Sequence, residues 1–153
     1  MPTALKISGS EITEVEVSND GGFIRDPDYL QRKRPFDSHA LARPDTWEGR
    51  KFNLAFVCWD QFYEKDFTKD TFNILGSYLY RMLKHRNAIL NDGIPGPVYL
   101  INEDRDGIID LTKEDLRYIV QRSRHFEDLQ NPQDLLLMLQ VLGALLIKYP
   151  ELR

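Results

Sequence analysis

Oxygen-bearing side chains surround a single glycine in the segment LINEDRDGIIDL, residues 100 to 111. A calcium loop of the helix-loop-helix type needs oxygen ligands at alternating positions, a glycine at position 6 and a bidentate acid at position 12. Four side chains fit ligand positions 1, 3, 5 and 9 of such a loop: Asn102, Asp104, Asp106 and Asp110. Position 12 is Lys113, however, whose charge would repel the ion. The sequence therefore favours a turn at Asp106-Gly107 between two strands, and these four residues are only a weak metal candidate.

Catalysis has few candidate residues in this chain. Cys58 could act as a nucleophile only beside a base, and the three histidines, His39, His85 and His125, are widely spaced along the sequence. The same spacing is not typical of a zinc site. The apolar run around Cys58 indicates a small buried residue, and no phosphate-binding glycine loop or nucleophile elbow is found. We expect a protein that is not an enzyme and that needs no cofactor.

The segment from Arg25 to Lys51 combines basic and aromatic residues with three prolines and has no sustained periodicity. We expect an irregular arm here, and so long a stretch within a compact domain is uncommon unless it is functional or disordered. Three aromatic side chains of this arm could anchor it on a neighbouring protein: Tyr29, Phe36 and Trp47. Three adjacent basic residues could instead bind the phosphates of a nucleic acid: Arg32, Lys33 and Arg34.

Apolar residues recur at helical spacing in three segments, near residues 69 to 90, 113 to 126 and 132 to 148. Thr68 or Thr71 could cap the first helix, a capping box from Thr112 to Asp115 opens the second, and Asn131-Pro132 opens the third. The third helix is apolar all round, which predicts burial on every side as a central core helix. A face shared with a second subunit is the alternative.

Short β-rich runs lie near residues 4 to 24, 53 to 59 and 98 to 111. Together with the helices they predict an α+β fold, in which a small, mainly antiparallel sheet packs against about three helices. A chain of 153 residues is the ordinary size of one domain, so we expect residues 1 to 153 to share a single core.

The composition is that of a globular protein, with 42% hydrophobic and 29% charged residues. A net charge of -4 argues against a surface built wholly for nucleic acid or anionic lipid. The single cysteine excludes an internal disulfide and favours a reducing, intracellular compartment, the cytoplasm first and the nucleus as the alternative. The sequence has no signal-peptide pattern and no apolar run of about 20 residues, so we expect no membrane partner.

The leading hypothesis from the sequence is a non-enzymatic, intracellular interaction or assembly module. It would self-associate, or bind a protein partner, through the arm 25–51 and the apolar C-terminal helix. The alternative hypothesis is a nucleic-acid-associated protein that binds phosphates through Arg32, Lys33 and Arg34, with the acidic body facing away.

Overall fold

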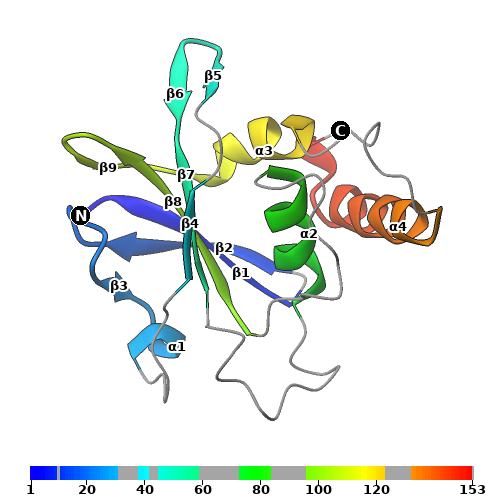
Figure 1. Cartoon of the computed structure of the whole chain (residues 1–153), viewed down its shortest axis with the longest axis horizontal. Coiled ribbons are helices and arrows are strands. Elements are labelled where there is room, and N and C mark those ends of the chain that lie inside the picture. Colours follow the sequence, from blue (N-terminus) through cyan, green and yellow to red (C-terminus); the bar gives the residue numbers. More distant parts are fainter. Residues whose placement is uncertain are drawn as a thin grey trace.

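An antiparallel sheet forms the centre of the protein (Figure 1). The computed structural model describes residues 1–9, 11–30, 38–41, 45–58, 73–83, 96–122 and 132–152. Over these residues the sheet has seven strands: β1 (Thr3–Ser8), β2 (Glu11–Val17), β3 (Ile24–Arg25), β4 (Ser38–Leu41), β7 (Leu54–Cys58), β8 (Val98–Asp104) and β9 (Gly107–Ile109). The strand order is β3-β2-β1-β8-β7-β4, and β9 pairs with β8 beyond the end of β1. A separate two-stranded hairpin is formed by β5 (Asp45–Trp47) and β6 (Arg50–Phe52).

Four α-helices accompany the sheet over the described residues: α1 (Pro27–Leu30), α2 (Ile74–Leu83), α3 (Leu116–Arg122) and α4 (Pro132–Lys148). A short 3-10 turn at Lys113–Asp115 leads into α3, and a second one at Pro150–Leu152 follows α4. The helices α2, α3 and α4 lie on one side of the sheet, whereas α1 lies beside β3 (Figure 1). The predicted α+β fold with a mainly antiparallel sheet is therefore confirmed.

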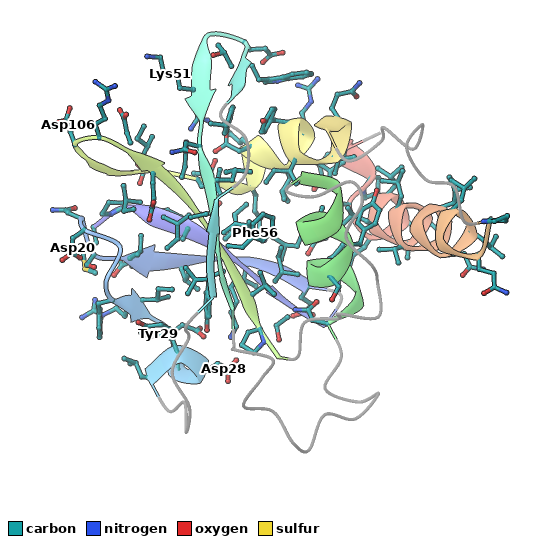
Figure 2. All side chains as sticks on the ribbon, in the orientation of Figure 1. Asp20, Asp28, Tyr29, Lys51, Phe56 and Asp106 are labelled. Carbon is teal, nitrogen blue, oxygen red and sulfur yellow. The ribbon has the colours of Figure 1, made fainter. Side chains whose placement is uncertain are left out.

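The sheet has a core on each of its faces. Leu5 and Ile7 of β1 join the larger core beneath the helices, whereas Ala4 joins a smaller cluster on the second face, because successive side chains of a strand point to opposite sides. Strands β7 and β8 are buried on both faces, which explains why each is a nearly continuous apolar run. Phe56 of β7 is fully buried between the sheet and the helices (Figure 2).

The start of α2 is fixed by Asn73, not by the predicted Thr68 or Thr71, which lie outside the described residues. The Asn73 side-chain oxygen accepts the Gly76 amide at 2.8 Å, and its amide group donates to the carbonyls of Ile7 and Gly96, both at 2.9 Å. One buried side chain thus caps the helix and joins it to β1. The capping bond spans only three residues and Asn is a favoured cap residue, so the sequence did contain a local signal for this cap.

The prediction of an irregular arm over residues 25–51 is wrong for the part that the structure describes. This segment contains α1, the edge strand β4 and the hairpin β5–β6, and Ala40 of β4 pairs with Phe56 of β7. Strand β4 is held by pairing with β7, which is distant in sequence, and β5 is held by pairing with β6 around a tight turn. Neither pairing requires a local periodicity in the sequence. Residues 31–37 and 42–44 lie outside the described residues.

Candidate functional site

Helix α4 lies outermost on the helix side of the sheet, with its long axis directed away from the strands (Figure 1). Its buried side chains Leu142 and Leu145 join the main core. At its C-terminal end the Tyr149 hydroxyl accepts the Ile12 amide at 3.0 Å. The prediction that this helix is buried on every side is wrong, because α2 and α3 already cover the sheet and α4 packs through one side only.

The other side of α4 carries a stripe that is apolar except for Gln140. It comprises Leu136, Leu139, Gly143, Ala144 and Ile147, of which Gly143 is half-buried and the others are exposed. The three large side chains are 58%, 47% and 73% exposed, in that order along the chain. Their spacing of three and then eight residues places them on one side of a helix. No other element among the described residues exposes more than one large apolar side chain. The stripe therefore has the most exposed large apolar side chains of any described element, which makes it a candidate contact surface.

Gly143, at the middle of the stripe, has open space beside it. A methyl group added there would meet no other part of the described protein within 4 Å beyond its own helix. Glycine inside a helix is less stable than alanine by roughly 0.5–1 kcal/mol, and its lack of a side chain allows another element to approach the backbone closely. Among the described residues, no element of the chain approaches the backbone at this glycine.

The predicted aromatic anchors of the arm have partners within their own chain. The ring of Tyr29 packs edge-on against Tyr99, with centroids 6.1 Å apart, and its hydroxyl donates to the Gly22 carbonyl at 3.2 Å. Figure 2 shows Tyr29 beneath the sheet on α1. Trp47 lies 5.9 Å from the Tyr118 ring. Phe36 and the basic residues Arg32, Lys33 and Arg34 lie outside the described residues.

The acidic segment forms the hairpin β8–β9, as the sequence favoured, although its two-residue turn is Arg105-Asp106 and not Asp106-Gly107. Three of the four oxygen-bearing residues accept different backbone amides. The Asn102 side-chain oxygen accepts the Asn53 amide, Asp104 accepts the amide of Arg105, and Asp110 accepts that of Thr3, at 2.8, 2.7 and 2.8 Å. Among the described residues no group of three potential ligands is arranged to hold a metal ion.

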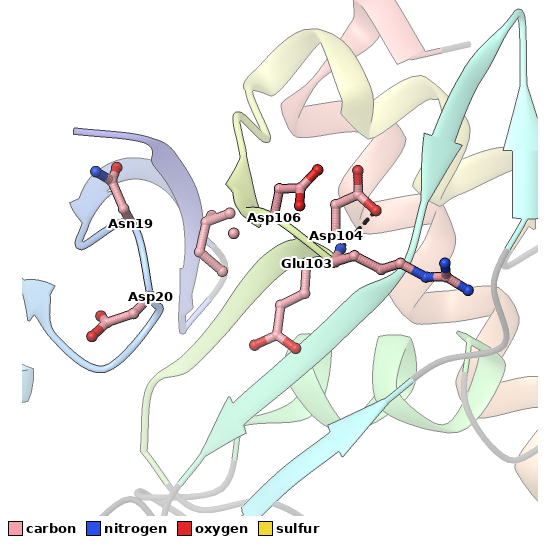
Figure 3. Close-up of a pocket in the computed structure, with 8 residues that line it drawn as sticks. Asn19, Asp20, Glu103, Asp104 and Asp106 are labelled. Carbon is pink, nitrogen blue, oxygen red and sulfur yellow. Dashed lines mark hydrogen bonds between the residues drawn. The ribbon is translucent and has the colours of Figure 1, made fainter.

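An acidic hollow of about 500 Å³ lies between this hairpin and the turn after β2, where Asn19, Asp20, Glu103 and Asp106 line it (Figure 3). The Ile108 amide donates to the Asn19 carbonyl at 3.0 Å, which joins the two turns. The Ser18 hydroxyl and the Gly22 amide hold the pKa of Asp20 below its usual range. The carboxylates of Asp20 and Asp106 point apart (Figure 3), so they do not converge on a ligand.

A second hollow, the aromatic hollow, was not foreseen from the sequence. It measures about 440 Å³ and lies between the hairpin β5–β6, the start of α3 and the last 3-10 turn. Phe52 and Tyr118 stack with centroids 4.1 Å apart, and the Arg50 guanidinium lies 5.2 Å from the Phe52 ring centre while it pairs with Asp115. Asp115 also accepts the Thr112 amide at 2.9 Å, as the predicted capping box requires.

A polar cluster on the second face of the sheet was also missed. Lys6 contacts the carboxylates of Asp26 at 2.9 Å and Asp28 at 2.6 Å, and the Tyr99 hydroxyl donates to Asp26 at 2.7 Å. Burial opposes charge on both Lys6 and Asp26, but their hydrogen bonds outweigh it, so the Lys6 pKa is raised and the Asp26 pKa is lowered. Burial and the bond to Asp26 raise the Tyr99 pKa. Each charge in this cluster has a partner, which indicates a structural role.

Among the described residues, the cysteine and histidines considered for catalysis form no catalytic site. Cys58 ends β7 and His39 lies on the neighbouring strand β4, whereas His85 and His125 lie outside the described residues. No helix within the described ranges has the length and apolar character needed to cross a membrane. Comparisons of the chain with protein-family models, with curated proteins and with solved structures found no match.

Proposed function

We propose that the protein is a non-enzymatic, intracellular assembly module that forms a homodimer through the exposed apolar stripe of α4. The observation that carries this proposal is the open space at Gly143 in the middle of the stripe, beside its three exposed large apolar side chains. An exposed apolar surface is costly in water, and a contiguous one on a folded protein commonly marks an interaction site. The lone cysteine supports the intracellular part of the proposal.

A second copy of the chain is the partner that matches this stripe. The stripe carries no charged residue, and its neighbour Lys148 lies 3.7 Å from Glu11, so the stripe itself does not call for a charged partner. If two copies of α4 cross antiparallel at Gly143, Leu139 of one copy is level with Ile147 of the other, because each is four residues from the glycine. The small residues allow the helices to approach, and the large residues fill the space on each side.

The interface expected from α4 alone is small. A helix of 17 residues is about 25 Å long at 1.5 Å per residue, which offers less area than the ~800 Å² per partner of a standard interface. We therefore expect a weak dimer whose population rises over the micromolar concentration range. The proposal does not depend on Tyr29 or Trp47, because their rings already contact their own chain.

The test compares two leucines of similar exposure on different helices. Leu139→Ser on α4 should raise the dimer dissociation constant about tenfold or more, because each dimer loses two buried leucines. Leu30→Ser on α1, where the leucine is 52% exposed against 47% for Leu139, should leave it unchanged. Sedimentation velocity over a concentration series measures both constants.

Two results would contradict the proposal. A wild-type chain that is monomeric up to millimolar concentration would exclude the dimer, and equal effects of the two serine substitutions would remove α4 from the interface. If the monomer instead binds duplex nucleic acid with an affinity that falls with added salt, and substitution of Arg32, Lys33 and Arg34 abolishes it, the alternative function would replace this one.

A further inference from the structure

The aromatic hollow has the size and construction of a binding site. Its volume of about 440 Å³ lies within the ~300–1,000 Å³ typical of small-ligand pockets. Its floor is apolar and buried, formed by Phe52, Tyr118 and Leu152, and Trp47 forms a half-buried wall. A long side chain that entered this hollow would find an aromatic surface along its length.

The aromatic wall already holds one cation. The Arg50 guanidinium lies 5.2 Å from the centre of the Phe52 ring and is paired with the Asp115 carboxylate, and it also donates to the Asp110 carbonyl at 3.0 Å. This is the arrangement by which proteins hold cations: a ring face on one side and a carboxylate on the other. In the stacked pair of rings, Arg50 lies against Phe52, whereas Trp47 lies against Tyr118.

The rim of the aromatic hollow has an excess of unpaired acid. Glu48, Glu114 and Glu151 are exposed and form no ion pair with the described residues. Two exposed cations, Lys113 and Arg117, lie on the same rim and are likewise unpaired there. Since Asp115 is neutralised by Arg50, the unpaired groups number three acids against two bases, which favours a cationic ligand.

The backbone at Glu48 adds an independent observation. Glu48 and Gly49 form the two-residue turn of β5–β6 with φ values of 48° and 79°. Glycine adopts this left-handed conformation freely, but a glutamate does so at a cost, and the first position of such a turn is usually Asn, Asp or Gly. The glutamate in this position places a carboxylate at the rim of the hollow, where a better turn former would place a shorter side chain or none.

We propose that the aromatic hollow binds a lysine side chain of a peptide or protein partner. The alkyl chain packs against Trp47 and the apolar floor, and the ammonium group is held among the rim glutamates. Trp is the most favourable ring for a cation, so Trp47 beside the ammonium adds to the attraction of the glutamates. This site is separate from the α4 stripe and does not depend on dimer formation.

The binding experiment uses the full chain labelled with ¹⁵N and a pentapeptide with one central lysine, acetylated and amidated at its ends. The Trp47 indole N–H and the Gly49 amide should shift saturably as the peptide is added. A matched peptide with norleucine, which keeps the alkyl chain without the charge, should bind at least about fivefold more weakly. A matched peptide with glutamate should cause no shift.

Charge substitutions on the rim give responses of opposite sign. Glu114→Gln should weaken binding of the lysine peptide several-fold, whereas Arg117→Gln should tighten it, since the one removes an attractive charge and the other a repulsive one. Asp106→Asn in the acidic hollow is the matched control and should change nothing. Reversed signs, equal binding of norleucine and lysine, or no shift at 20-fold excess over a roughly millimolar protein sample would each overturn the proposal.

Discussion

At the scale of single residues, the ion pair of Lys6 and Asp26 places charge beside the apolar cluster on the second face of the sheet, to which Tyr99 belongs. A charge removed from water is costly unless it is paired and hydrogen-bonded. Lys6 and Tyr99 are direct cross-strand neighbours of β1 and β8, and Asp26 reaches both from the segment between β3 and α1. The cluster therefore joins that segment to the middle of the sheet.

Removal of the Asp26 charge should destabilise the protein in a pH-dependent way. Asp26→Asn should lower the free energy of unfolding by about 1–3 kcal/mol at pH 7, because Lys6 and Tyr99 lose their ionised acceptor. The Asp26 pKa is lower in the folded than in the unfolded chain. Its contribution is thus full above the unfolded value of about 3.9 and is lost as the pH falls through the folded value. Urea denaturation at pH 7 and pH 3 measures the difference.

Asp28 provides the control for this prediction. Its carboxylate also contacts Lys6, but its side chain is 56% exposed against 10% for Asp26. Asp28→Asn should therefore change the stability by no more than about 1 kcal/mol, since water replaces much of what is lost. An effect as large as that of Asp26→Asn would mean that burial does not set the strength of these pairs.

At the scale of elements, two helix glycines have opposite surroundings. A methyl group at Gly76 of α2 would lie 2.8 Å from the Val98 side chain and 2.9 Å from Asn73, whereas one at Gly143 of α4 would meet nothing within 4 Å. Gly76→Ala should therefore cost about 1–3 kcal/mol of stability through overpacking. Gly143→Ala should stabilise the monomer by roughly 0.5–1 kcal/mol while weakening the dimer.

Chemical denaturation of dilute protein compares the two alanine variants directly. Both variants replace a glycine within a helix by alanine, so the higher helix propensity of alanine alone would stabilise both variants. If Gly76→Ala were as stable as the wild type, the close contact between α2 and β8 would not constrain the helix.

Several elements fixed by local chemistry could be predicted from the sequence, although the hairpin β5–β6 was not among them, and elements fixed by distant partners could not. The hairpin β8–β9, the capping box at Thr112 and the helix start at Pro132 follow from neighbouring residues. Strand β4 pairs with a strand more than ten residues away in sequence, which no local pattern reveals. For α4 the sequence was apolar on all sides, so periodicity could not decide which side faces water.

At the scale of the whole molecule, apolar residues fall into two populations that the composition does not distinguish. One is the core on the two faces of the sheet, and the other is the exposed stripe of α4. The first population stabilises the monomer, because its side chains leave water on folding. The side chains of the stripe stay in water in the monomer, and they stabilise a complex only when a partner covers them.

Paired alanine substitutions separate these two populations. Phe56→Ala should cost about 3–5 kcal/mol, since the ring is fully buried and its removal leaves a cavity beneath the helices. Ile147→Ala should change monomer stability by less than about 0.5 kcal/mol, because this side chain is 73% exposed, and yet it should weaken self-association. Denaturation of dilute protein and sedimentation of concentrated protein measure the two quantities. If Ile147→Ala destabilised the monomer as Phe56→Ala does, α4 would be part of the core and its stripe would not be available to a second copy.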